Sequence, residues 1–282
     1  MAEQYADCLR LASNHYENFP VVSRLLPKDV RPSVAAIYAF ARRADDLADE
    51  GCEDADTRLA RLTAYASRLE SIGTSNPSQD PVFCALADTV ARYRLPLQPF
   101  RDLLSAFRMD VVKRRYADVD ELLGYCRRSA NPVGRLLLHL LGEASAPNIA
   151  LSDKVCTGLQ LTNMLQDLGQ DYEENGRIYL PQDEMAAYGV SERHFRERVS
   201  DQAMHRLVGA QIERAEGLLR HGLPLAKRLS GRAGLHMRLV VHGGLRILER
   251  IRAHPRDPFG RPRLRRRDWL LILARALRMP RN

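Results

Sequence analysis

The sequence is poor in cysteine, tryptophan and long hydrophobic runs. It has five cysteines and one tryptophan in 282 residues. The cysteines are odd in number and form no CxxC pair and no Cys/His cluster, which argues against a disulfide framework or a zinc site. We therefore expect a reducing, cytoplasmic environment.

No stretch of the sequence is apolar for long enough to suggest a membrane-spanning helix. The longest apolar runs, such as Leu136–Leu141 and Trp269–Leu273, fall far short of the ~18 residues that a span needs. The first 19 residues contain early acidic side chains and no apolar core, unlike a secretory signal. We expect a chain that does not span a membrane.

Positive charge is concentrated at one end of the chain. The formal net charge is +8, yet residues 246–282 alone contain twelve arginines, no lysine and three acidic residues. The remainder is therefore nearly neutral. This pattern suggests an anionic partner for the C-terminal end and is unlike that of a uniformly basic nucleic-acid coat protein.

Helical periodicity dominates, and alternating or β-branched runs are almost absent. The pattern predicts an all-α fold in a single domain over residues 1–282, with the stretches 73–81 and 175–189 as loops inside it. The predicted helices cover about residues 32–50, 57–72, 81–94, 97–113, 118–130, 133–142, 149–174, 200–228, 232–253 and 267–278.

The first candidate site lies in the predicted helix 32–50, within the segment YAFARRADDLADE. Tyr38, Arg42, Asp45 and Asp49 are spaced i, i+4, i+7 and i+11, so they share one helix face, with Asp46 beside it. A solvated acidic helix end is the alternative. The surrounding alanines and bulky apolar residues favour a helix inside a bundle, with its carboxylates facing a cleft.

The second candidate site lies in the predicted helix 149–174, within the segment QLTNMLQDLGQD. Gln160, Asn163, Asp167 and Asp171 are spaced i, i+3, i+7 and i+11 and form a polar stripe on an otherwise apolar helix. A surface-facing stripe is the alternative. No Lys or Arg lies between Val155 and Tyr172 to pair with the acids, which weakens that alternative.

If the two stripes face each other, they predict a cation site. Two carboxylates about 5.5 Å apart repel by about 3 kcal/mol at an effective dielectric constant of about 20, so a fold tolerates several of them only where a cation binds. Oxygen ligands without His or Cys suit Mg²⁺, which completes its shell with water and phosphate oxygens. The substrate class predicted is a phosphate or diphosphate ester.

Three arginines could supply the positive counterpart. Arg42 precedes the first acidic group by one turn, Arg177 follows the second in the segment GRIYLP, and Arg261 lies in the basic C-terminal part. Arginine can bind a phosphate through two parallel hydrogen bonds. An ordinary surface charge is the alternative for each.

These segments, together with LLPKDVRPSVAAIYAFARRADDLADE, resemble the head-to-head prenyl synthases, a family that includes squalene, phytoene and dehydrosqualene synthases. The resemblance runs from about His15 to Arg261. It implies an all-α isoprenoid-synthase bundle around a central apolar cavity, with Mg²⁺ as cofactor. It implies metal binding by Asp45, Asp46, Asp49, Asn163, Asp167 and Asp171, and substrate binding by His15, Asn18, Tyr38, Arg42, Tyr125, Gln160, Asn163, Arg177, Tyr179 and Arg261.

One departure from the family pattern indicates which members of the family the chain resembles most. Many members have a second tyrosine in the helix opposite the acids, a proposed acid/base in forming a cyclopropane, where this chain has Arg128. Together with HYENFPVVSRLLP and SANPVG, this change resembles the hydroxysqualene synthases. These convert presqualene diphosphate and water to hydroxysqualene and diphosphate in bacterial squalene and hopanoid biosynthesis. The resemblance implies that Asp45, Asp49, Asp167 and Asp171 act in catalysis, without NADPH. Arg128 is a further catalytic candidate.

Two other readings stay open. A condensing enzyme of the same family would make presqualene diphosphate, squalene or phytoene. A basic helical membrane-binding module would use the arginine-rich C-terminal end on lipid, and an interfacial helix from Trp269 onward is one form of this contact, although a core-packed last helix is the favoured reading. No nucleic-acid motif is present. Peripheral contact with the inner membrane face and association with other squalene-pathway enzymes are further expectations.

Overall fold

The structure is a computed structural model of the whole chain, and it describes residues 5–14, 23, 25–51, 53–75 and 78–278. Within these residues it contains helices and no β-strand, with one isolated bridge between Tyr116 and Pro181. The predicted all-α fold is confirmed. The chain divides into two compact units: residues 1–112 with 132–149 form the first, and residues 113–131 with 150–282 form the second.

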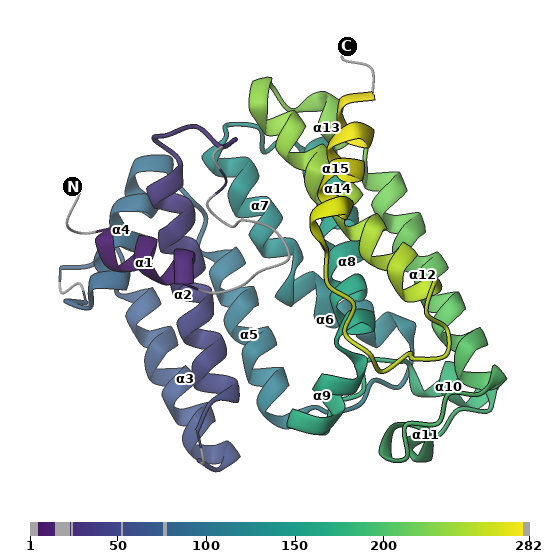
Figure 1. Cartoon of the computed structure of the whole chain (residues 1–282). Helices are drawn as coiled ribbons and strands as arrows, with labels where there is room; N and C mark the ends of the chain where they lie inside the picture. Colours follow the sequence, from purple (N-terminus) through teal and green to yellow (C-terminus); the bar gives the residue numbers. More distant parts are fainter. Residues whose placement is uncertain (1–4, 15–22, 24, 52, 76–77, 279–282) are drawn as a thin grey trace. The chain divides into compact units, whose positions relative to one another are not determined.

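The helices of the first unit are α1 (Ala6–Asn14), α2 (Arg31–Asp49), α3 (Ala55–Glu70), α4 (Pro81–Tyr93), α5 (Gln98–Val112) and α7 (Asn131–Leu140). Among them, α1, α3, α4 and α5 pack against α2 (Figure 1). Five alanines of α2 are fully buried and let its neighbours approach closely: Ala35, Ala36, Ala39, Ala44 and Ala48. The ring of Phe40 contacts those of Tyr65, Phe83 and Phe100, with centroids 5.2–5.9 Å apart. This aromatic core fixes α2, which carries the first acidic group.

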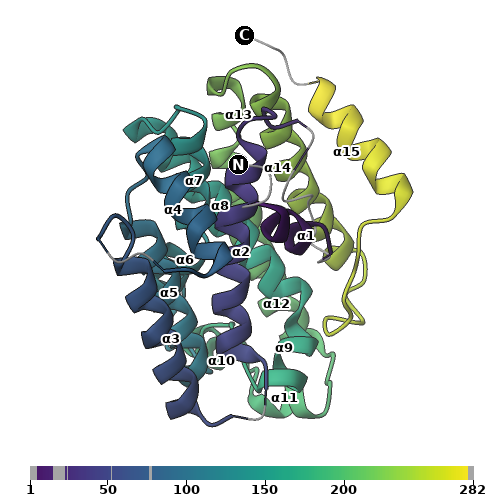
Figure 2. The same cartoon turned by 90° about the vertical axis from the view of Figure 1, so that its left-hand side faces the viewer.

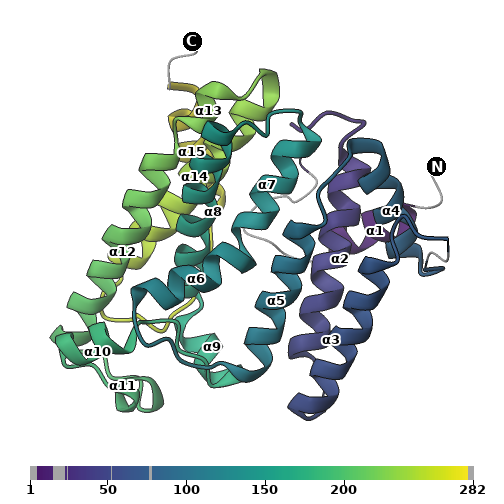
Figure 3. The same ribbon diagram turned by 180° about the vertical axis from the view of Figure 1, so that it is seen from behind.

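The second unit is built on α14, which packs against α12, α13 and α15 (Figure 2). Its helices are α6 (Val119–Ser129), most of α8 (Ala146–Gln166), α9 (Leu168–Asn175), α10 (Gln182–Tyr188), α11 (Glu192–Arg196), α12 (Gln202–Gly222), α13 (Leu225–Arg228), α14 (Gly231–Arg252) and α15 (Arg266–Arg278). Helix α8 lies along α12 and α14 (Figure 3). A Cβ on Gly222 of α12 would lie 2.5 Å from the side chain of Val155 on α8, so this close packing requires glycine.

The predicted helices are present, with three changes, and the structure adds α1 and α11, which the periodicity did not predict. Helix 200–228 divides into α12 and α13 next to Pro224, which has no N–H to continue the helical hydrogen bonds. Helix 149–174 bends at Asp167 into α8 and α9. The expectation of a loop over 175–189 is wrong from Gln182 onward, because α10 forms there, with acidic residues in its first turn and left-handed Gly189 (φ 77°) after its last.

Candidate active site

The first acidic group lies on α2 in the predicted register. Because α2 is helical from Arg31 to Asp49, the spacing of Tyr38, Arg42, Asp45 and Asp49 places them on one face. The guanidinium of Arg42 lies 2.6 Å from a carboxylate oxygen of Asp46 and 3.4 Å from one of Asp45. Arg42 therefore balances part of the negative charge of its own helix.

The same arginine also reaches the end of α2, where its Nη2 donates to the Glu50 carboxylate at 3.1 Å. Although burial lowers the pKa of Arg42, the carboxylates of Asp45 and Asp46 outweigh it and raise that pKa above its ordinary value. Arg42 stays fully charged. A fixed cation beside three carboxylates suits the binding of a substrate phosphate together with a metal ion.

The second acidic group lies at the bend between α8 and α9. Asp167 separates the two helices, yet its N–H still donates to the carbonyl oxygen of Asn163, and the N–H of Asp171 donates to that of Asp167, both at 2.8 Å. The i, i+4 spacing therefore continues through the bend. Asp167 and Asp171 remain neighbours on one side of the bent helix.

Arg261 reaches this group from the loop after α14. Its Nε lies 2.5 Å from Oδ1 of Asp167, and its Nη2 lies 3.2 Å from Oδ2, so the guanidinium binds the carboxylate through two contacts. Arg261, which the sequence predicts to bind diphosphate, therefore contacts the second acidic group within this unit. Arg261 is separated from Asp167 by 94 positions in the sequence.

The loop that carries Arg261 is held against the bend by neighbouring contacts. The amide of Gln166 donates to the carbonyl oxygen of Pro262 at 2.7 Å. A Cβ on Gly169 would lie only 2.5 Å from the carbonyl oxygen of Phe259, so only glycine lets the loop lie this close to α9. Arg198 donates to that same carbonyl at 3.2 Å and stacks over the Phe259 ring. These contacts fix the position of Arg261.

Burial and mutual repulsion disturb the ionisation of the second group. Burial and the Asp167 carboxylate raise the pKa of Asp171 to about 7, against the opposing effect of Arg177. Burial also raises the pKa of Asp167, while Arg261 and Arg263 oppose the rise. Two neighbouring carboxylates that resist ionisation are stabilised by an added cation.

The segment GRIYLP forms an ordered connection after α9. The backbone N–H of Ile178 donates to the Arg114 carbonyl at 3.0 Å, and that of Gln182 donates to the Tyr116 carbonyl at 2.9 Å. These bonds bring Tyr179 beside Tyr116 and Tyr125, with the three ring centroids 5.6–5.7 Å apart. Tyr125 and Tyr179, both predicted to bind substrate, therefore lie together.

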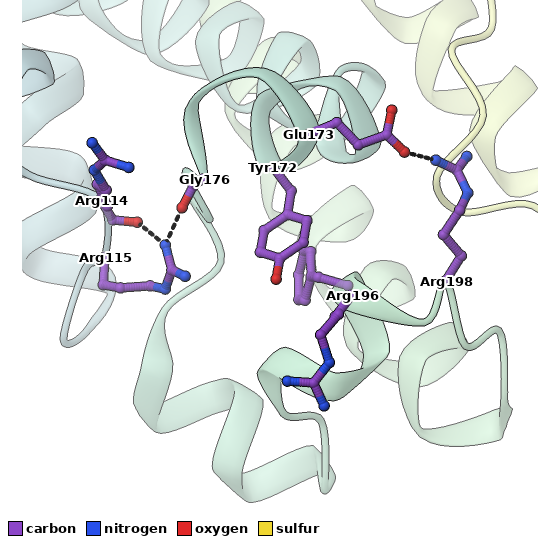
Figure 4. Close-up of a pocket in the computed structure, with 8 residues that line it drawn as sticks. Arg114, Arg115, Tyr172, Glu173, Gly176, Arg196 and Arg198 are labelled. Atoms are coloured by element: carbon purple, nitrogen blue, oxygen red, sulfur yellow. Dashed lines mark hydrogen bonds and ion pairs between the residues drawn. The ribbon is translucent and has the colours of Figure 1, made fainter.

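A pocket of about 520 Å³ beside α9 has four arginines in its lining (Figure 4). All four have partners: Arg114 donates to the Asn175 carbonyl oxygen at 3.2 Å, and Arg196 lies 3.4 Å from the Glu197 carboxylate. Arg115 donates to the carbonyl oxygens of Arg114 and Gly176, and Arg198 pairs with Glu173 of α9. These bonds hold both α9 and the start of the GRIYLP segment in place.

Among the other predicted residues, Arg177 lies next to the second acidic group, where its backbone N–H donates to the Asp171 carbonyl oxygen at 3.0 Å. Gln160 is half-buried and Asn163 exposed on α8, while Arg177 is buried. The exposed Arg128 donates to the Gly124 carbonyl of its own helix at 3.0 Å. His15 and Asn18 lie outside the described residues. Sequence reasoning missed Tyr116, Arg198 and Phe259; Gly169, an isolated glycine inside a helical pattern, was a signal for a close approach.

The donor chemistry fits magnesium. In the part of the chain that the structure describes, no three His, Cys, Asp or Glu side chains are grouped so that they could hold a metal ion alone. An ion bound at Asp167 and Asp171 would take its other ligands from water and phosphate oxygens, as Mg²⁺ usually does. The two acidic groups belong to different units, and their convergence on shared ions stays a prediction.

Comparison with known proteins first defines the class. The fold matches the crystal structure of a squalene synthase, HpnC, from Alicyclobacillus acidocaldarius with a TM-score of 0.84 and 36% sequence identity, covering 91% of this chain and 96% of that one. The chain therefore has the helical fold of the isoprenoid synthases. None of the helices among the described residues has the length and hydropathy to cross a bilayer.

Sequence comparison then defines the family. Residues 12–269 match the model of the squalene/phytoene synthase family. The chain is 38% identical to a hydroxysqualene synthase of Rhodopseudomonas palustris, over 89% of this chain and 84% of that protein. It is 34% identical to a 15-cis-phytoene synthase of Synechococcus elongatus, over 76% and 73%. The chain belongs to the squalene/phytoene synthase family, whose members include enzymes that condense prenyl diphosphates head to head.

Proposed function

We propose that the chain is a hydroxysqualene synthase, which converts presqualene diphosphate and water to hydroxysqualene and diphosphate. The observation that carries this proposal is the half-buried pair Asp167 and Asp171 with Arg261 bound beside it. Such a pair suits a metal-bound diphosphate leaving group. The choice of substrate within the family is supported by the similarity to hydroxysqualene synthases and by Arg128 in place of a tyrosine.

The residues that would hold Mg²⁺ are Asp45, Asp46 and Asp49 on α2, and Asn163, Asp167 and Asp171 on α8 and α9. When bound, Mg²⁺ supplies positive charge that stabilises the departing diphosphate oxygens. Arg42, Arg177 and Arg261 supply further positive charge to the diphosphate. Arg261 would exchange part of its contact with Asp167 for a phosphate oxygen, because a guanidinium binds either anion in the same bidentate geometry.

In the proposed reaction the carbon–oxygen bond to diphosphate breaks and its electron pair leaves with the diphosphate. The cyclopropylcarbinyl cation left behind rearranges in an apolar cavity. A water oxygen then bonds to the carbon and releases a proton, so neither an oxidant nor a reductant is required. The chain supplies fixed charges at the leaving group rather than a covalent nucleophile. The proposed role of Arg128 is to hold the diphosphate or position the water.

The direct test uses purified protein with Mg²⁺ and without NADPH. Presqualene diphosphate and farnesyl diphosphate are supplied in separate reactions, and the products are identified by mass spectrometry. Hydroxysqualene from the first and no product from the second is the expected result. A product formed from farnesyl diphosphate would contradict the proposal. An Arg128→Tyr variant with unchanged turnover and product would remove Arg128 from the mechanism.

The second candidate function is head-to-head condensation of two prenyl diphosphates. The similarity to a phytoene synthase supports it, and the same acidic groups and arginines would serve it. It differs in needing a base for the first step, at which Arg128 is unsuited because arginine stays protonated. Parallel reactions with farnesyl and geranylgeranyl diphosphate separate the condensing enzymes from each other. Association with other squalene-pathway enzymes stays a prediction.

A further inference from the structure

The last helix, α15, has one side fixed to its neighbour. Asp268, Ile272 and Ala276 are spaced four residues apart, and all three are buried in the packing of α15 on α14 (Figure 2). The spacing places them on a single stripe of the helix. The inward side of α15 is therefore defined, and so is the side that faces away from α14.

Ion pairs hold α15 in this orientation. The Asp268 carboxylate accepts from Arg246 at 2.7 Å and from Arg250 at 3.0 Å, both on α14. Arg275 of α15 pairs with Glu249 of α14 at 2.5 Å. Asp268 is the one acidic residue of α15, and it points inward. The outward side therefore carries no negative charge.

The outward side is apolar. We define the α15 face as Trp269, Leu270, Leu273 and Leu277, whose exposed fractions are 38%, 71%, 44% and 56%. Leu270, Leu273 and Leu277 are spaced i, i+3 and i+7, so they form one stripe, and Trp269 lies one turn before Leu273. A contiguous exposed stripe of this kind marks an interaction surface.

Arginines border the α15 face at both ends. Arg266 and Arg267 are exposed in its first turn, and Arg278 is exposed at its last residue. Leucine and tryptophan between exposed arginines is the pattern of a helix that lies in a membrane interface. The tryptophan ring suits the headgroup level, and guanidinium groups attract anionic lipid phosphates.

We propose that the α15 face docks on the surface of an anionic lipid bilayer. Charge complementarity selects this occupant. A second copy of the chain would bring the same arginines against each other, and like charges placed opposite each other in an interface are unfavourable. The inference does not depend on the proposed reaction.

The single tryptophan provides a direct probe, because Trp269 belongs to the α15 face. The full-length protein is titrated with vesicles of phosphatidylcholine alone and of phosphatidylcholine with 30% phosphatidylglycerol. We expect the fluorescence of Trp269 to shift to shorter wavelength with the anionic vesicles, with binding that weakens as salt is added. Co-sedimentation with the same vesicles measures the affinity independently.

Two variants separate the apolar and the charged contributions. Leu270→Ser/Leu273→Ser/Leu277→Ser should weaken vesicle binding at least tenfold, because it removes apolar side chains from the face. Arg266→Gln/Arg267→Gln should weaken binding to anionic vesicles about fivefold for each arginine. Arg206→Gln/Arg232→Gln, which removes two exposed arginines elsewhere in the same unit, is the matched control and should bind as the wild type does.

The variants should keep their helical circular dichroism and their turnover of detergent-dispersed substrate, since the face lies outside the candidate active site. Absence of wild-type binding to the anionic vesicles would overturn the proposal. So would serine variants that bind like the wild type, or equal affinity for neutral and anionic vesicles. A wild-type dimer that the serine substitutions convert to a monomer would instead assign the face to a second copy.

Discussion

The two acidic groups carry similar charge but are balanced differently. On α2 the balancing cation is Arg42, three and four residues from its partners, and the side chains of Asp45 and Asp46 are 39% and 31% exposed. At the bend after α8 the cation is Arg261, which is 94 positions away from Asp167. The contacts of Arg42 with Asp45 and Asp46 thus form together with their own helix. The second group exists only when the loop after α14 is in place, and it remains strained by burial.

The largest effect expected is on catalysis, where the two groups should behave alike. Asp171→Asn and Asp49→Asn each remove one carboxylate ligand that would hold the metal and the diphosphate. Each should lower kcat with presqualene diphosphate about a thousandfold, measured as product formed per enzyme under saturating substrate. Glu213→Gln, an exposed change on α12, is the control. Retention of a tenth of the wild-type kcat by either variant would contradict a metal-binding role.

The next largest effect is on the free energy of unfolding in the absence of metal, where the two acidic groups should differ. Since the pKa of Asp171 is raised to about 7, its ionisation costs folding free energy. This cost is absent below about pH 4, grows as the pH rises, and is complete above about pH 7. In EDTA at pH 8, Asp171→Asn should raise the free energy of unfolding by roughly 2–4 kcal/mol. Asp49→Asn should leave it nearly unchanged.

Urea denaturation between pH 5 and pH 8 measures this difference. The advantage of Asp171→Asn over the wild type should shrink steadily toward pH 5, because the wild-type carboxyl is then protonated in the folded state. Added Mg²⁺ and diphosphate should stabilise the wild type and leave Asp171→Asn unaffected, as binding to the folded state alone predicts. A variant that is less stable than the wild type at pH 8 would show that Asp171 is a structural residue.

A third change tests whether the second group depends on its loop. Gly169→Ala places a methyl group against the Phe259 carbonyl and should displace the loop that carries Arg261. We expect a loss of about 2 kcal/mol in unfolding free energy together with a raised KM. Gly217→Ala on α12, with no heavy atom near the added Cβ, is the control and should gain up to about 1 kcal/mol. Equal changes in unfolding free energy and KM for the two variants would contradict the idea that Gly169 positions the loop that carries Arg261.

The same difference explains what the sequence could predict. The register of Tyr38, Arg42, Asp45 and Asp49 follows from helical periodicity alone, and the structure confirms it because α2 is helical throughout this segment. The short helix α10 was predictable in principle, since Pro181 and Gly189 stand at its two ends, but both residues were read as parts of a loop. Periodicity describes one helix at a time.

The contacts around Asp167 could not be predicted from helical periodicity. The approach of Phe259 to Gly169 joins residues 90 positions apart, and the Tyr116 ring meets Tyr179 through a backbone bridge between two loops. Neither follows from local pattern, because each depends on how α14 and its following loop pack within the second unit. The sequence indicated Arg261 as a candidate phosphate-binding arginine, whereas the residues that hold its loop in place came only from the structure.

The smallest effect expected is the loss of unfolding free energy caused by Arg42→Gln. Arg42→Gln removes ion pairs made within one partly exposed helix, and such pairs stabilise proteins by about 0.5 kcal/mol or less. Arg261→Gln should cost more, about 1–2 kcal/mol, because it leaves the more buried Asp167 without its bidentate partner. The effect of Arg42→Gln should vanish in 1 M NaCl, where surface charges are screened, while that of Arg261→Gln should largely persist. Equal losses at both salt concentrations would mean that the first group is as dependent on tertiary contacts as the second.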